Sequence, residues 1–208
     1  MRLSFQPSKK PLIELSAVLL AELSTLGVSF PQILMGTGLA LLLGLMLSSI
    51  VVTTTKQDRR KPRSRHWISR LIYVVYLLLI AVLALTAFGS LLQFGHLSGY
   101  PLLAHVAASG AFVFLMVAIA FLYLPSEAVA LDARNLRVPS WWAERWSVWG
   151  LVVSSLAVAA TMLVSMLPWL DTQGLRDMAL IHRYAGLAVV VFAILHLFST
   201  ICCRLGWR

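Results

Sequence analysis

The sequence has few charged residues and almost no cysteine, and both shortages exclude common classes of protein. Charged residues make up only 12% of the 208 positions, whereas apolar residues make up 60%. The mean hydropathy is +0.86. A soluble domain of this length cannot bury so much apolar surface in one core, but a lipid bilayer tolerates it. The composition therefore predicts an all-α integral membrane protein.

The chain also lacks the motifs of several redox and catalytic centres. Its two cysteines, Cys202 and Cys203, are adjacent, so they provide neither a disulfide framework nor an iron–sulfur cluster, and we expect both thiols to stay reduced. No Cys-x-x-Cys-His occurs, which excludes covalent c-type haem attachment. A Gly-rich nucleotide loop and a Ser/His/Asp set are missing as well. Any substrate chemistry would therefore belong to a partner subunit.

Five apolar stretches are each long enough to cross a bilayer, which takes roughly 20 residues. They run over residues 32–54, 67–94, 101–124, 148–170 and 181–203. These stretches predict a helical bundle of about five transmembrane helices. Coupled transporters typically show inverted halves and buried acids, and neither feature is found in the five stretches.

The basic residues cluster at the ends of the apolar stretches and predict the orientation of the chain. The connection from Lys56 to Arg65, taken together with Arg70, carries seven basic residues against one acid, Asp58. The positive-inside rule places this loop and the C-terminus in the cytoplasm. A net charge of +9 that is distributed in this way indicates membrane topology and contact with lipid, not nucleic-acid binding.

Residues 1–30 allow two interpretations. Residues 12–30 are apolar but contain Glu14 and Glu22, and a carboxylate in mid-bilayer is costly. One interpretation is an interfacial amphipathic helix on the outer face of the membrane. The other is a short sixth span. In both cases residues 31–208 form the transmembrane domain.

Four of the five histidines fall at two depths of the predicted bundle. His182 and His196 lie fourteen residues apart on the last span. Fourteen steps of about 100° return to within roughly 40° of the start, so both rings share one helix face, about 21 Å apart along the axis. His105 enters the third span at the level of His182, and His66 opens the second span at the inner end, as does His196. Two imidazoles at one level can ligate the iron of a non-covalent b-type haem, so the pattern predicts two b-type haems in a four-helix core.

Other interpretations of the histidines stay open. Each could be a hydrogen-bonded packing residue, and His66 could be a solvated interface residue; the chain would then be a haem-free membrane scaffold. His96, in the turn before the third span, could replace His105 as a ligand. His96, His105 and His182 could instead form a metal site on the outer side, as in a metal-handling membrane protein.

Three segments resemble the bacterial di-haem cytochrome b family, which includes the membrane subunits of formate dehydrogenase N and of nickel–iron hydrogenase. Arg65-His66-Trp67 is similar to the start of the family's first haem-binding helix, and Leu102-Leu103-Ala104-His105 followed by Gly110 is similar to its second. Ile181-His182-Arg183-Tyr184-Ala185-Gly186, followed by Ile194-Leu195-His196, is similar to its last helix. The resemblance covers about residues 64–204 and does not extend to the first span.

The resemblance implies that His105 and His182 hold an outer haem and that His66 and His196 hold an inner one. It also implies an electron-transfer subunit of a larger oxidoreductase in the bacterial inner membrane. In the family, quinone binds near the inner haem. A dehydrogenase, hydrogenase or multihaem cytochrome subunit would dock near the outer one.

Small and basic residues close to the predicted ligands suit a haem. Arg183 follows His182, and its guanidinium could pair with a haem propionate. Gly186 lies one turn after His182 on the same face, while Gly110 and Gly89 lie in the third and second spans. Glycine lets a flat porphyrin approach the backbone, although glycine in membrane helices also serves close packing of helices.

Overall fold

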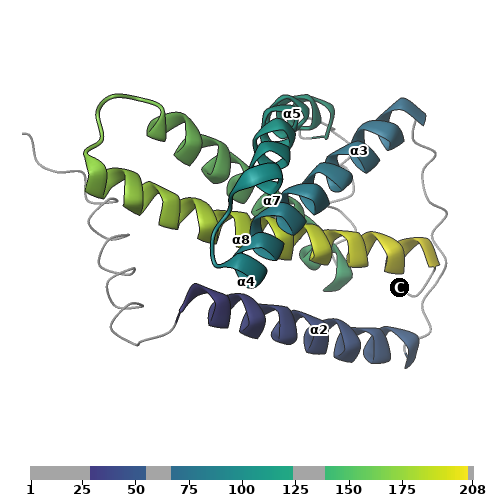
Figure 1. Cartoon of the computed structure of the whole chain (residues 1–208). Helices are drawn as coiled ribbons and strands as arrows, with labels where there is room; N and C mark the ends of the chain where they lie inside the picture. The colour runs from purple at the N-terminus through teal and green to yellow at the C-terminus, as the bar shows by residue number, and fades with distance from the viewer. Residues whose placement is uncertain (1–28, 55–66, 124–138, 206–208) are drawn as a thin grey trace, which may run out of the picture. The chain divides into compact units, whose positions relative to one another are not determined.

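The computed structural model describes residues 29–54, 67–123 and 139–205. Within these ranges the chain is helical except at the connections, and it contains no strand. The elements in Figure 1 are α2 (Phe30–Thr54), α3 (Trp67–Ala84), the π-helical turn η1 (Leu85–Gly89), α4 (Ser90–Phe94), α5 (Gly99–Tyr123), α7 (Pro139–Ser165) and α8 (Thr172–Leu205). The expectation for residues 1–30 falls almost wholly on residues outside these ranges and stays a prediction.

Five helices in the described part of the chain are long and apolar enough to cross a membrane, which confirms the predicted number of spans. Helices α3 and α4, with η1 between them, form one of the five. The large apolar side chains of α2 are mostly exposed, and so are those on the outside of the other helices, including Leu85 and Phe114. Such surfaces are stable against lipid but not against water.

Helices α7 and α8 begin earlier than the hydropathy pattern predicts. They start at Pro139 and Thr172, nine residues before positions 148 and 181. Proline suits the first turn of a helix because it has no N–H to leave unpaired. At the start of α8, the Asp171 carboxylate accepts a hydrogen bond from the Gly174 N–H at 2.7 Å and caps the helix. Helix α8 has 34 residues, or about 51 Å, so it is longer than a hydrocarbon core of about 30 Å.

Helices α3, α5, α7 and α8 pack into one bundle within the unit that begins at Leu41. The contact between α7 and α8 is the most extensive, because residues 166–171 join the two as a hairpin (Figure 1). Residues 95–98 join α4 to α5 in the same way. Gly95 ends α4 with a φ of 74°, a left-handed conformation that favours glycine. The end of the bundle that carries both connections is called the turn end below.

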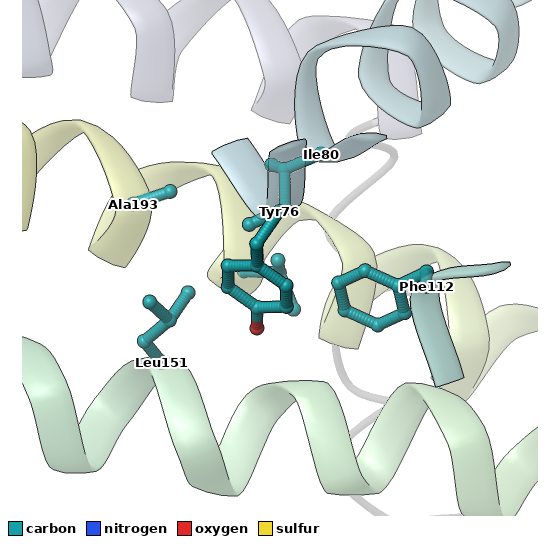
Figure 2. Close-up of a cluster of buried hydrophobic side chains, with 6 residues drawn as sticks. Tyr76, Ile80, Phe112, Leu151 and Ala193 are labelled. Atoms are coloured by element: carbon teal, nitrogen blue, oxygen red, sulfur yellow. The ribbon is translucent and has the colours of Figure 1, made fainter. Parts of the chain in front are cut away.

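A small aromatic core lies in the middle of this bundle (Figure 2). The rings of Tyr76 in α3 and Phe112 in α5 are stacked, with centroids 5.3 Å apart. The Tyr76 hydroxyl lies 3.0 Å from the Ser155 hydroxyl of α7, so a hydrogen bond satisfies both buried groups. The cluster is completed by Ile80, Leu151, Val189 and Ala193. Because lipid removes most of the hydrophobic driving force between helices, close packing of this kind holds the bundle together.

One glycine is required for the packing of α7 on α8. A Cβ atom added at Gly150 would overlap the ring of Phe192, whereas one added at Gly110 would meet no atom within 4 Å. We expect Gly150→Ala to lower the free energy of unfolding by about 1–3 kcal/mol through overpacking. Gly110→Ala is the control and should not lower it, because alanine favours a helix over glycine by about 1 kcal/mol. Unfolding in mixed detergent–SDS micelles, followed by tryptophan fluorescence, measures both; equal effects would contradict the packing.

Candidate functional site

Each histidine in the described spans contacts a hydroxyl group from a neighbouring helix, and in each case the ring atom is Nδ1. The contacts are His105 with Thr86 Oγ1 at 3.0 Å, His182 with Thr161 Oγ1 at 3.1 Å, and His196 with Ser147 Oγ at 3.4 Å. The histidines come from α5 and α8, and the hydroxyl groups come from η1 and α7. Four helical segments therefore supply the three pairs.

The hydrogen-bond pattern around His105 determines which ring nitrogen carries the proton. The Thr86 hydroxyl donates its hydrogen to the carbonyl oxygens of Val82 and Leu83, at 2.8 and 3.1 Å. Its oxygen is then left to accept from Nδ1–H of His105. This arrangement favours the Nδ1–H tautomer of the neutral ring, with its lone pair on Nε2.

His182 has the same environment on a different helix. The Thr161 hydroxyl donates to the Val158 carbonyl at 2.8 Å and accepts from Nδ1–H of His182. This arrangement again favours the Nδ1–H tautomer, with the lone pair on Nε2. His105 and His182 are close enough for their charges to interact. The structure thus places the two histidines that the sequence predicts for the outer site within electrostatic range of each other.

His196 lies at the opposite end of the bundle. Its ring packs edge-on against Tyr73 of α3, with centroids 5.8 Å apart and planes at 78°. Ser147, its hydroxyl contact, is buried near the start of α7. His66, the predicted partner of His196, lies outside the described residues, and its pairing with His196 stays a prediction.

The spacing of the hydroxyl groups on α7 matches the spacing of the histidines on α8. Thr161 and Ser147 are fourteen residues apart, as are His182 and His196. Because α7 and α8 are antiparallel neighbours, one register places both hydroxyl groups opposite both rings. Ser154 lies midway between Ser147 and Thr161, and all three are buried. Both histidines of α8 therefore contact a hydroxyl group of the same helix through Nδ1.

The π-helical turn places Thr86 opposite His105. A π-turn adds a residue to a helix and changes the direction of the side chains that follow, and such turns are frequent at functional sites. Thr86 is the second residue of η1 (Leu85–Gly89). A Cβ at Gly89, in the same turn, would meet nothing within 4 Å.

The other residues that the sequence analysis singled out near the predicted haems lie in different surroundings. Arg183 is exposed, and a Cβ at Gly186 or Gly110 would meet no atom within 4 Å. Cys202 is buried. Exposed His96 donates from Nδ1–H to the Phe94 carbonyl at 2.8 Å. Among the described residues, no three His, Cys, Asp or Glu are gathered to hold a metal ion, so the three-histidine metal site does not form there.

The sequence pattern alone missed Thr86, Thr161 and Ser147. Each is a hydroxyl residue inside an apolar span, which is a common and unspecific feature. The matched spacing of fourteen on α7 and α8 was present in the sequence and could have indicated two of the three pairs. Nothing comparable in the sequence indicated Thr86, because the π-turn changes its direction.

An open apolar groove runs along α7 and α8, from Trp146 and Phe192 at the end near His196 to Ala157 and Ala185 nearer His182. It has a volume of about 510 Å³. Its lining includes Trp146 and Trp149 of α7 and Phe192 of α8, together with small residues. Trp146 precedes Ser147, and Phe192 lies one turn before His196. The groove is large enough for part of a lipid-soluble molecule.

The two histidines at the turn end can bind a metal through Nε2. A neutral imidazole whose Nδ1–H is held by a hydrogen bond is the usual form of a histidine ligand. Imidazoles of this kind are among the protein groups that ligate haem iron. No protein-family model matches the chain, and no curated protein or solved structure is similar to it. The resemblance to di-haem cytochromes b accordingly rests on the quoted segments alone.

Proposed function

We propose that this chain is the di-haem cytochrome b subunit of a larger oxidoreductase in a bacterial inner membrane. The observation that carries the proposal is the matched environment of His105 and His182. Both rings are held at Nδ1 by a threonine, both keep the Nε2 lone pair, and the two lie near each other on different helices. A packing histidine gains nothing from such an arrangement beyond one hydrogen bond.

The outer haem would take His105 and His182 as axial ligands. Haem iron supplies one-electron chemistry when it is bound. The chain's part is to hold two imidazoles in fixed orientation, and the threonines of η1 and α7 do this. The open space at Gly186 and Gly110 supports the approach of a flat group to the backbone, and Arg183 is the proposed partner of a propionate.

The inner haem would take His196 and His66. His196 is held by Ser147 and packs against Tyr73, seven residues after His66 in the chain. The contact of His196 with Tyr73, on the helix that follows His66 in the chain, supports the pairing.

Electrons would pass between the quinone pool and a partner subunit. The apolar groove along α7 and α8, one end of which lies at Trp146 and Phe192, supports a quinone near the inner haem, because its lining suits an isoprenoid tail. The loop Lys56–Arg65 and the C-terminus would face the cytoplasm, as the positive-inside rule predicts. A dehydrogenase, hydrogenase or multihaem cytochrome subunit would then dock at the turn end on the outer side.

An absorption spectrum tests the proposal. The full-length chain is expressed with added haem precursor, purified in detergent, and reduced with dithionite. We expect b-type bands and about two haems per chain by the pyridine haemochrome assay. A colourless protein would leave the haem-free scaffold as the better description. Bound zinc without haem, measured by elemental analysis, would favour the metal-handling alternative instead.

A further inference from the structure

We propose that Thr86 and Thr161 are positioning residues that lock His105 and His182 as Nδ1–H tautomers, so that both Nε2 atoms are ready to bind iron before haem arrives. The tautomers are inferred from hydrogen-bond geometry alone, whereas their consequence for haem binding rests on the proposed function. Neither threonine touches the iron in this arrangement; each acts through its histidine.

The local geometry supports a shared role because the two threonines are used alike. Each hydroxyl donates to the backbone of its own helix, Thr161 to the Val158 carbonyl and Thr86 to the carbonyls of Val82 and Leu83. Each threonine oxygen also lies within hydrogen-bond distance of a histidine Nδ1, at 3.0 and 3.1 Å. Two unrelated packing contacts have no reason to repeat this sequence of carbonyl, hydroxyl and imidazole on two different pairs of helices.

The arrangement also has a cost that an ordinary packing contact would avoid. Around Thr86 the helix departs from α-helical geometry over the five residues of η1. A π-turn is less stable than an α-helix and persists where it serves the position of a side chain. Because the π-turn η1 places Thr86 opposite His105, it supports a positioning role for Thr86.

The first test reads the tautomers directly. The full-length chain is labelled with ¹⁵N-histidine, expressed without added haem and purified in detergent. Two-bond ¹H–¹⁵N correlations distinguish Nδ1–H from Nε2–H rings, and the five histidines are few enough to assign by single substitutions. We expect Nδ1–H at His105 and His182. Thr86→Val should shift the tautomer equilibrium of His105 alone towards the Nε2–H form. Thr161→Val should do the same for His182 alone.

The second test uses the haem-loaded protein. Valine keeps the shape of threonine but removes the acceptor, so each Val variant should bind the outer haem at least about tenfold more weakly. Losing the hydrogen bond also makes the imidazole a poorer donor to ferric iron, so the midpoint potential of that haem should rise. Thr86→Ser and Thr161→Ser should restore both properties, because serine retains the hydroxyl.

Ser154 provides a matched control within α7. Its hydroxyl donates to the carbonyls of Gly150 and Leu151, as Thr86 donates to two helix carbonyls, but no histidine contacts it. Ser154→Ala should leave the tautomers, affinity and potential unchanged. The proposal would be overturned if His105 and His182 were Nε2–H tautomers in the unsubstituted chain. It would also be overturned if the Val variants matched Ser154→Ala in tautomers, haem affinity and midpoint potential. Nδ1–H rings in a chain that never binds haem would refute the cytochrome assignment and leave the tautomers established.

Discussion

Replacing His182 with alanine is expected to lower the haem content from about two per chain to about one. The outer iron would lose one of its two axial imidazoles, and a non-covalent b-type haem has no other bond to the protein that can replace it. His182 is also held by Thr161 and lies within electrostatic range of His105. The pyridine haemochrome assay and redox titration of the purified variant measure the loss.

The identity of the remaining haem decides whether the pairing is correct. His105→Ala should lose the same haem as His182→Ala, whereas His196→Ala should lose the other one and leave the outer haem in place. His96→Ala is the control, because His96 is exposed and bonds only to a nearby carbonyl. Loss of both haems, or of neither, in His196→Ala would contradict two separate sites on α8.

Removing the ring of Phe112 is expected to cause the largest loss of stability in the bundle. The side chain is only 2% exposed and stacks on Tyr76 at the centre of the core. Phe→Ala in soluble cores costs 3–5 kcal/mol, part of it from transfer to water. In lipid the transfer part is small, so we expect about 3 kcal/mol, mainly from lost packing contacts. Unfolding in mixed detergent–SDS micelles measures the change.

Phe114 is the matched control on the same helix. It lies two residues after Phe112 and is 82% exposed, so it faces outward where Phe112 faces the core. Phe114→Ala should change the free energy of unfolding by less than about 0.5 kcal/mol. Similar losses for both variants would mean that the cluster drawn in Figure 2 is not the core of the bundle.

The spans were predictable because they depend on local sequence. A membrane helix satisfies its own backbone hydrogen bonds, so length and hydropathy suffice to identify it. The errors lay at the ends of α7 and α8, where Pro139 and the Asp171 cap start the helices in polar sequence. The shared face of His182 and His196 was equally local, because it follows from the geometry of a single helix.

Which groups meet across the bundle was decided by the tertiary structure. Lipid-facing and protein-facing residues are both apolar in a membrane protein, so hydropathy does not show which faces pack together. The antiparallel register of α7 on α8 brings Thr161 to His182 and Ser147 to His196. The π-turn brings Thr86 to His105 across a different pair of helices. The sequence by itself determined the apolar helices and the shared face of His182 and His196, because these are properties of single helices; the hydroxyl partners depended on packing between helices and so on the fold.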